Sequence, residues 1–261
     1  MDFSHVDDSR SRELIEYLDF GSRFSRDDKL RTFAIQQLDA GMNVLDIGCG
    51  TGDDVRAIAE IVGSLGRVTG IDPSEAMIGE ANARGVPSNA TFGVGSAYTL
   101  PYADGGFDAV RADRVMQHLR EPDVAASELR RVSKAGGTAL LLDQDWGSLM
   151  ISGAETATTK RIVRTFGEHF ARPWAGREAP GLLRRAGFPK VDFTTMVSTP
   201  VFPVAFVNVL NPAVDVAVQA GRIDEDAGER WLNSLLEADQ RGEFFCAIAV
   251  VVALGACPGQ R

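Results

Sequence analysis

The chain alternates between short continuous apolar runs and stretches in which apolar residues recur every three or four positions. Short apolar runs are typical of strands covered on both faces, and the wider spacing is typical of helices with one buried face. The predicted strands lie at about 43–47, 67–71, 91–94, 107–111, 138–143, 190–198 and 244–254. This alternation of strands and helices predicts an α/β fold with a doubly wound, mostly parallel sheet.

Local signals place several helix boundaries. Asp53–Val62 gathers its apolar side chains on one face. Ser74 suits the N-cap of a helix that runs to Arg84, because its hydroxyl can accept a hydrogen bond from a free backbone N–H. Pro122 lies in the first turn of a predicted helix at 121–132, where proline is tolerated.

Three segments lie outside this core pattern. They are the helical, acidic residues 1–40, residues 147–177 with a helix at 155–170, and residues 201–241 with helical patterns at 203–220 and 224–241. The second and third segments leave from the carboxyl ends of predicted parallel strands, where ligands bind in open α/β sheets. We therefore expect the three segments to form a lid over a ligand, with ordinary helix packing as the alternative for any one residue.

Composition narrows the functional classes. The 261 residues are 44% hydrophobic, enough to bury a full core, and the formal net charge is −9. Without a basic stripe, we expect no nucleic-acid partner. Three scattered cysteines predict neither a disulfide framework nor a metal site, and favour a reducing cytoplasm. The N-terminus shows no signal-peptide pattern, and the apolar run 244–254 is too short to span a bilayer, so no membrane is expected.

The most informative stretch is Val44–Asp54, in which a strand pattern ends in a glycine-rich turn and a helix pattern follows. This arrangement is typical of nucleotide-type cofactor sites, but Asp53 occupies the place of the third glycine in the dinucleotide fingerprint. Asp46 within the strand would repel a pyrophosphate and attract an ammonium or sulfonium group. S-adenosylmethionine (SAM) combines an adenosine with such positive charges and fits the loop.

Further motifs follow in order at consistent spacing. They are Gly70–Met77, Phe92–Ala97, Leu100–Tyr102, Gly106–Val110 and Arg130–Gly137. Together with Val44–Gly52 they resemble the motifs of class I SAM-dependent methyltransferases, in particular bacterial enzymes that modify secondary metabolites or quinone-like compounds. The resemblance covers roughly Leu38 to Trp146. It implies a Rossmann-like sheet of seven strands with an antiparallel last strand.

On this resemblance the chain divides into residues 1–40 as an N-terminal helical cap and residues 41–146 as a SAM-binding core. Residues 147–261 would complete the sheet and carry the lid insertion at about 201–241.

The resemblance also implies the cofactor contacts. The candidate residues are Asp46, Gly48, Cys49, Gly50, Gly52, Asp72, Pro73, Met77, Gly95, Ser96, Ala97, Asp113 and Arg114. Asp46 would face the methionine ammonium, and Asp72 would bond the ribose hydroxyls unless it caps the next helix. Many relatives have Asp where Ser96 stands, so the adenine contact would be uncharged here, or this segment is a plain turn. The alternative for Arg114 is an ion pair with Asp113.

Candidates for the reaction itself lie after the fourth and fifth strands. His118 would be a general base near neutral pH, or else a packing histidine. Asp145 would orient an amine or hydroxyl, with a turn acid as the alternative. The candidate substrate contacts are Tyr17, Trp146, His169, Phe170, Trp174 and Phe206.

The sequence therefore predicts a cytoplasmic enzyme, monomeric or homodimeric, that transfers a methyl group from SAM to a small molecule and releases S-adenosylhomocysteine (SAH). Oxygen or nitrogen is the favoured acceptor atom. Two alternatives stay open: carbon methylation of a quinone or polyprenyl-like precursor, and a SAM-binding cyclase or regulatory protein that does not methylate.

Overall fold

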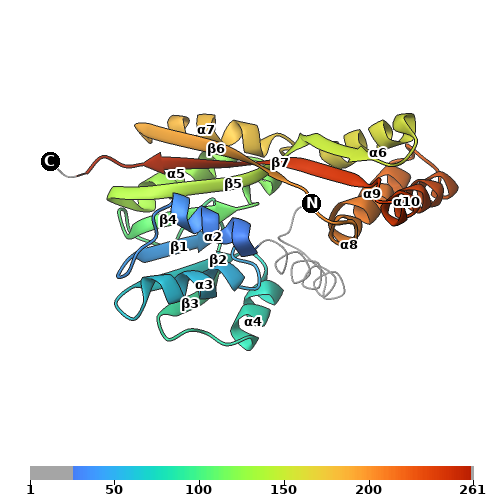
Figure 1. Cartoon of the computed structure of the whole chain (residues 1–261). Coiled ribbons are helices and arrows are strands. Elements are labelled where there is room, and N and C mark those ends of the chain that lie inside the picture. Colours follow the sequence, from blue (N-terminus) through green and yellow to red (C-terminus); the bar gives the residue numbers. More distant parts are fainter. Residues whose placement is uncertain (1–25, 260–261) are drawn as a thin grey trace.

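The structure is a computed structural model that describes residues 26–259, and its centre is a seven-stranded sheet in the order β3-β2-β1-β4-β5-β7-β6 (Figure 1). The strands are β1 (Asn43–Ile47), β2 (Arg67–Asp72), β3 (Ala90–Val94), β4 (Phe107–Asp113), β5 (Ser133–Ser152), β6 (Lys190–Ser198) and β7 (Phe245–Ala256). The pairs that join β3, β2, β1, β4 and β5 are parallel, whereas β7 runs antiparallel to both β5 and β6. The predicted fold class is confirmed.

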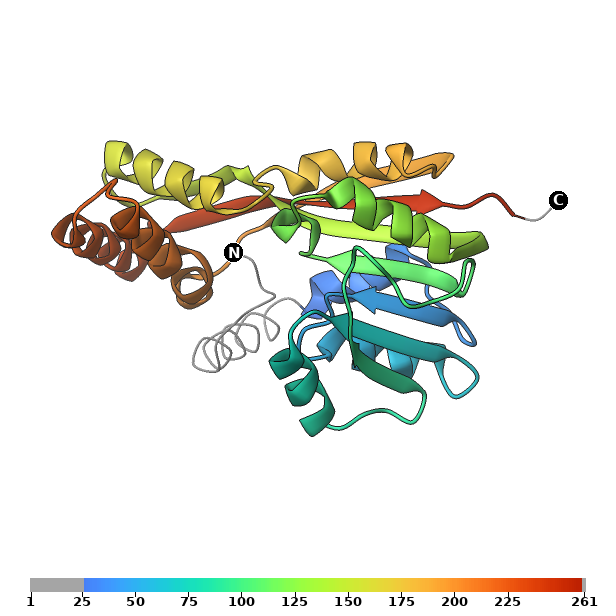
Figure 2. The ribbon, with the colours of Figure 1, turned by 180° about the vertical axis from the view of Figure 1, so that it is seen from behind.

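Helices cover the two faces of the sheet. The helices α2 (Arg26–Ile35), α3 (Asp53–Val62) and α4 (Glu75–Ala83) pack on one face, and α5 (Pro122–Val132) and α7 (Ala175–Arg185) pack on the other, as Figure 2 shows from behind. Successive side chains of a strand point to opposite faces. Val44 of β1 therefore belongs to the apolar cluster on the face covered by α2, α3 and α4, and Leu45 and Ile47 belong to the cluster on the face covered by α5 and α7.

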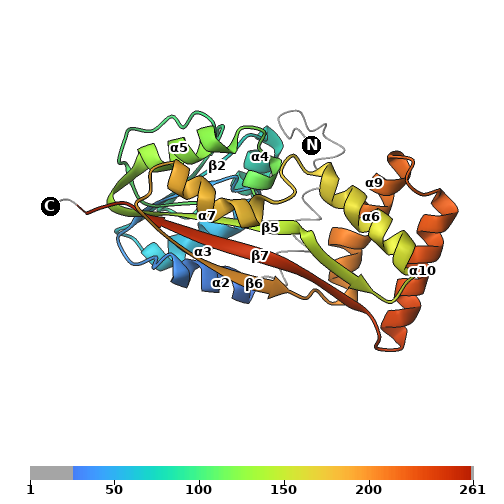
Figure 3. The ribbon, with the colours of Figure 1, turned by 90° about the horizontal axis from the view of Figure 1, so that it is seen from above.

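The remaining helices form one body at the carboxyl edge of the parallel strands. They are α6 (Thr156–His169), α8 (Phe202–Ala205), the π-helical turn η3 (Phe206–Leu210), α9 (Asn211–Gln219) and α10 (Glu225–Gln240). We call them the helical unit; they share one apolar cluster with the adjoining ends of β5 and β7 (Figure 3). Trp231 of α10 donates to the hydroxyl of Thr159 on α6 at 2.8 Å. The two predicted lid segments thus pack as one body.

The fifth strand departs from the prediction. It does not end at residues 143–146 but continues to Ser152, so the predicted boundary at residue 146 falls inside β5. The reason is tertiary: after a register shift between Asp145 and Met150, the strand pairs again with β7. The helix α7 also lacks a counterpart among the predicted elements; Pro180 inside it obscures the helical pattern.

One stretch of the described residues, Phe202–Gln219, is long and apolar enough to cross a membrane by length and composition alone. Its apolar side chains include Leu210 and Ala213, both fully buried in the cluster of the helical unit. Packing against α6 and α10 accounts for this composition.

Candidate active site

The loop between β1 and α3 requires its glycines for steric reasons. Gly48 has φ +70° and Gly52 has φ +85°, the left-handed region that favours glycine. A Cβ at Gly48 would lie 2.5 Å from a methyl of Val115, and one at Gly52 would lie 2.5 Å from the ring of Phe92. The alternating glycines thus let the chain turn sharply at the carboxyl end of β1.

Asp72 at the end of β2 is tied to this loop. Its carboxylate accepts hydrogen bonds from the backbone N–H of Gly50 at 3.0 Å and of Ser74 at 2.9 Å. Burial raises the pKa of Asp72, and these two bonds oppose the rise. Ser74 caps α4 as predicted, accepting from the N–H of Met77. Asp72 is therefore not the α4 cap, and the ribose contact that the resemblance implies for it stays a prediction.

Beneath the loop lies a buried ion pair that the motifs do not predict. Asp46 of β1 stands directly opposite Arg111 of β4, and Arg111 Nε lies 3.5 Å from Asp46 Oδ1. The Arg111 side chain is fully buried, stacks 4.6 Å from the ring centroid of Phe33 on α2, and contacts Asp54 of α3 at 3.0 Å. The acid expected to face the methionine ammonium thus already has a cationic neighbour.

Further charges extend this cluster towards the carboxyl edge. Lys29 of α2 bonds Asp113 and, at 2.9 Å, Asp54. Arg114 Nε lies 3.1 Å from Asp113, which is the ion pair that the sequence left as an alternative. Arg114 itself has φ +57°, unusual for a residue with a side chain. We call Lys29, Asp46, Asp54, Arg111, Asp113 and Arg114 the charge cluster; it balances three acids against three bases.

The two acids at either side of Arg111 differ in their ionisation. Burial, followed by the charge of Asp54, raises the pKa of Asp46 to about 7, although Arg111 and Lys29 oppose this rise. The pKa of Asp113 lies well below its usual range because the charges of Lys29, Arg114 and Arg111 outweigh burial. The structure therefore holds Asp113 as an anion and leaves Asp46 near its midpoint at neutral pH.

On the adenine side of the predicted site, Gly95 donates its N–H to the carbonyl of Asp72 at 3.0 Å. Ser96 is exposed, and its hydroxyl accepts from the N–H of Tyr98 at 3.2 Å, whereas Ala97 is buried. Burial raises the pKa of Cys49, so its thiol stays protonated and is a poor nucleophile.

Polar and aromatic side chains from several elements meet around the 3-10 turn η2 (Met116–His118), next to the loop between β1 and α3. His118 ends η2, and its Nε2 lies 3.1 Å from Gln117 Nε2. Gln117 Oε1 accepts from the indole N–H of Trp146 on β5 at 2.8 Å. The ring of Trp146 stacks on Phe170, with centroids 4.4 Å apart and planes at 10°. Phe170 also lies 5.8 Å from His118.

The expected near-neutral pKa of His118 is not found. Burial, with the charge of Arg114 adding to it, lowers the pKa of His118 to about 4. The ring is therefore neutral at pH 7 and a weaker base than an exposed imidazole.

The other predicted acceptor contacts are placed unevenly. Phe206 packs in the cluster of the helical unit with Phe170, whereas Trp174 and His169 are exposed. Tyr17 lies outside the described residues. Asp145 is buried and forms a two-armed ion pair with Arg177, with Nη2 at 2.7 Å from Oδ1. To orient an acceptor, Asp145 would have to share its oxygens with Arg177.

Sequence reasoning missed Arg111 and Arg177, and it placed Gln117 near the site without giving it a role. A signal existed for Arg111: a charged residue within an apolar strand pattern is unusual. The prediction ended the fourth strand at this residue, but the strand continues to Asp113, so Arg111 is internal and buried. No local signal marks Arg177, because its partner is 32 residues away.

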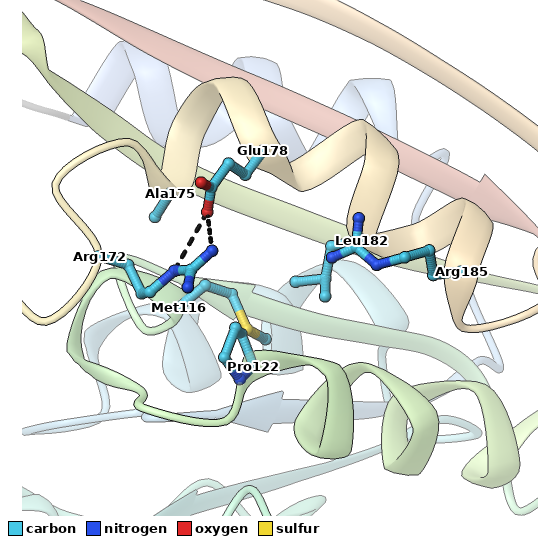
Figure 4. Close-up of a pocket in the computed structure, with 7 residues that line it drawn as sticks. All are labelled: Met116, Pro122, Arg172, Ala175, Glu178, Leu182 and Arg185. Carbon is cyan, nitrogen blue, oxygen red and sulfur yellow. Dashed lines mark hydrogen bonds and ion pairs between the residues drawn. The ribbon is translucent and has the colours of Figure 1, made fainter.

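A small recess lies next to this site, between η2, the start of α5 and α7 (Figure 4). Arg172 and Glu178 form an ion pair in its wall, with Arg172 Nε 3.1 Å from Glu178 Oε2, and Met116 and Leu182 line the recess beside them. The recess has room for little more than a water molecule. Its ion pair anchors the segment that packs against Gln117 and Trp146.

Comparison with known proteins agrees with this geometry. The model of the methyltransferase domain family matches residues 38–172, just over half of the chain. The chain belongs to the class I SAM-dependent methyltransferases. The cofactor of this methyltransferase is SAM, and the residues present fit it: the glycine turn, the buried acid of β1 and the anchored acid of β2 are all in place.

Two curated relatives and one solved structure illustrate the family. The methyltransferase is 33% identical over 95% of its length to an uncharacterised 37.1 kDa protein of transposon Tn4556 from Streptomyces fradiae, of which it covers 73%. It is 36% identical over 51% of its length to demethylmenaquinone methyltransferase of Staphylococcus aureus, and spans 56% of that protein. Phosphoethanolamine N-methyltransferase 2 of Haemonchus contortus shares the fold, with a TM-score of 0.58 and 18% identity over 90% of this chain and 53% of that one.

Proposed function

We propose that the methyltransferase acts on a small molecule, at oxygen or nitrogen, and that the acceptor lies against the Trp146–Phe170 stack. The observation that carries this proposal is the stack itself, at a centroid distance of 4.4 Å, with His118 at 5.8 Å from Phe170. These side chains adjoin the carboxyl end of β4 and the neighbouring part of β5, and ligands of open α/β sheets bind at the carboxyl ends of the parallel strands. Trp146 is buried behind Phe170, so the half-buried ring of Phe170 supplies a flat apolar wall. This wall suits a ring or an alkyl group, and the polar groups beside it suit a hydroxyl or an amine.

When bound, SAM supplies a methyl group on a positively charged sulfur. The residues of the chain have to hold the acceptor in line and exclude water, and orientation of this kind is worth on the order of 10⁵–10⁸ M of effective molarity. The predicted acceptor contacts Phe206 and Phe170 belong to the apolar cluster of the helical unit. We propose that this unit covers the acceptor in a cytoplasmic monomer or homodimer; residues 1–25, which the sequence also assigns to the lid, lie outside the described residues.

Carbon methylation of a quinone-like precursor is the second candidate, because the demethylmenaquinone methyltransferase of Staphylococcus aureus is 36% identical over the part that it shares with this chain. A quinone ring would also suit the aromatic wall. The two candidates differ in the atom that receives the methyl group.

The test is a screen of the purified protein with SAM against phenols, primary amines and a dihydroxynaphthalene, with SAH release as the readout and product NMR to locate the methyl group. We expect an O- or N-methyl product. A C-methyl product would favour the second candidate. SAH release that does not depend on any added acceptor would contradict both candidates. Trp146→Ala and Phe206→Ala should raise KM for the acceptor and leave KM for SAM unchanged, with the exposed Val201→Ala as control.

The cofactor assignment has its own test. Asp72→Ala removes a carboxylate that would accept from the ribose hydroxyls, and bonds to a charged group contribute about 1.5–3 kcal/mol. Calorimetric titration with SAH should therefore show an affinity about 10–100-fold weaker. The exposed Asp226→Ala on α10 is the control. Unchanged affinity in a folded Asp72→Ala protein would refute the ribose contact.

A further inference from the structure

Gln117 is held so that its amide can adopt one orientation only. Its Oε1 lies 2.8 Å from the indole nitrogen of Trp146, which can only donate a hydrogen bond. Its Nε2 lies 3.5 Å from the backbone carbonyl of Arg114, which can only accept. Both neighbours require the same assignment, with the oxygen towards Trp146 and the NH₂ group towards Arg114.

This orientation determines the tautomer of His118. The same NH₂ group lies 3.1 Å from His118 Nε2. Because an amide NH₂ only donates, Nε2 has to accept and therefore carries no proton. In a neutral imidazole the single proton is then on Nδ1.

The backbone of Gln117 is fixed from two sides, so the amide cannot easily turn away. Its N–H donates to the buried carboxyl of Asp143 at 3.2 Å, and its carbonyl accepts from the N–H of Arg172 at 3.0 Å. Pro173, next to Arg172, accepts from the N–H of Trp146 at 2.9 Å. The same short segment thus fixes both Gln117 and the indole that orients it.

We propose that Gln117 is a positioning residue that holds His118 as the neutral, Nδ1-protonated tautomer, so that the ring meets the acceptor as a hydrogen-bond donor rather than as a general base. The part that concerns the acceptor rests on the proposed function, whereas the tautomer rests on the contacts above. A donor at this place would align an acceptor oxygen through one lone pair and leave another for the methyl group. An amine nitrogen has a single lone pair, so this alignment applies to oxygen acceptors.

The surrounding charges are compatible with this state. The positive charge of Arg114 disfavours a positive charge on the His118 ring, and burial acts in the same direction. Burial also raises the pKa of Asp143, the acid that accepts from the N–H of Gln117, well above its usual range, so this acid is less charged than an exposed one.

The experiment is two-bond ¹⁵N–¹H NMR of the full chain with ¹⁵N-labelled histidine, with and without SAH, and His118→Asn assigns the signals. Wild type should show the Nδ1–H pattern for His118 from pH 6 to 8. In Gln117→Glu the carboxylate needs a donor from the ring, so the proton should move to Nε2 and the pKa should rise by about 1–3 units. Gln219→Glu, exposed at the end of α9, is the charge-matched control.

Two milder variants keep the test valid if Gln117→Glu does not fold. Gln117→Met and Trp146→Phe should each give a mixture of tautomers while far-UV circular dichroism stays unchanged. An Nε2–H pattern in wild type, or an unchanged tautomer in every folded variant, would overturn the proposal.

Kinetics separate this proposal from the proposed function. If an acceptor is found, wild-type kcat should show no limb between pH 6 and 7, and Gln117→Met should lower kcat on the order of 10²-fold without changing KM for SAM. A wild-type limb in this range that is lost in His118→Asn would overturn the donor role. An Nδ1–H signal without methyl transfer to any acceptor would count against the proposed function and leave the tautomer assignment standing.

Discussion

At the residue scale, the most consequential finding is that Asp46 has a partner before any ligand is considered. Arg111 lies 3.5 Å away, yet burial and Asp54 keep the pKa of Asp46 at about 7. For a carboxyl group whose pKa is raised in the folded state, the stability contribution is present at low pH and is lost as pH rises through about 7. An incoming ammonium would stabilise the ionised form and so recover part of that loss.

The first prediction follows from this titration. SAH, which carries the same ammonium, should bind about tenfold more tightly at pH 8 than at pH 6, because the ionised fraction of Asp46 rises by about this factor across a pKa near 7. Calorimetric titrations at several pH values measure this. Asp46→Asn should bind weakly with a flat profile. A wild-type profile that is equally flat would show that Asp46 does not face the ammonium.

At the scale of elements, β4 shows how a strand can carry charges in a buried sheet. Its apolar residues Val110 and Ala112 face α5 and α7, while Arg111 and Asp113 face the side where α2 and α3 lie. Those two helices supply the partners, Lys29 and Asp54, and the ring of Phe33 covers the guanidinium. The strand is stable in this place only because helices distant in sequence complete its charge balance.

Removing Arg111, the central cation of the charge cluster, should therefore lower the free energy of unfolding. Arg111→Met keeps the length of the side chain but leaves three carboxylates with fewer positive charges, and breaking a buried ion pair in this way costs about 3–5 kcal/mol. Urea unfolding at pH 7.5 measures the loss. The double variant Arg111→Met with Asp46→Asn should recover part of it, since one uncompensated acid is gone. A loss below about 1 kcal/mol would show that Arg111 is not needed for charge balance.

At the scale of the whole molecule, two long strands join the sheet to the helical unit. Residues of β5 contribute to the core with Leu141 and to the helical unit with Leu149, and β7 does the same with Ala253 and Ile248. Neither body can lose its packing without disturbing strands that the other needs.

We therefore expect a single cooperative unfolding transition. Calorimetry should give equal calorimetric and van't Hoff enthalpies, as in two-state domains. Trp231→Phe, which removes the 2.8 Å bond to Thr159 inside the helical unit, should lower the midpoint of the whole transition. Two separate transitions, with only one shifted by this variant, would show that the helical unit unfolds independently.

The sequence by itself determined most of the elements, the sheet type and the cofactor loop, but not the full length of β5 or the helix α7. The strand Asn43–Ile47, the helix Asp53–Val62 and the Ser74 cap all follow from local burial patterns and backbone preferences, which neighbouring residues decide. Only the tertiary structure decided which charges and rings meet. Lys29 reaches Asp113 across 84 positions, and Arg177 reaches Asp145 across 32. Such contacts depend on how helices pack over the sheet, and this packing also moved the pKa of His118 from near neutrality to about 4.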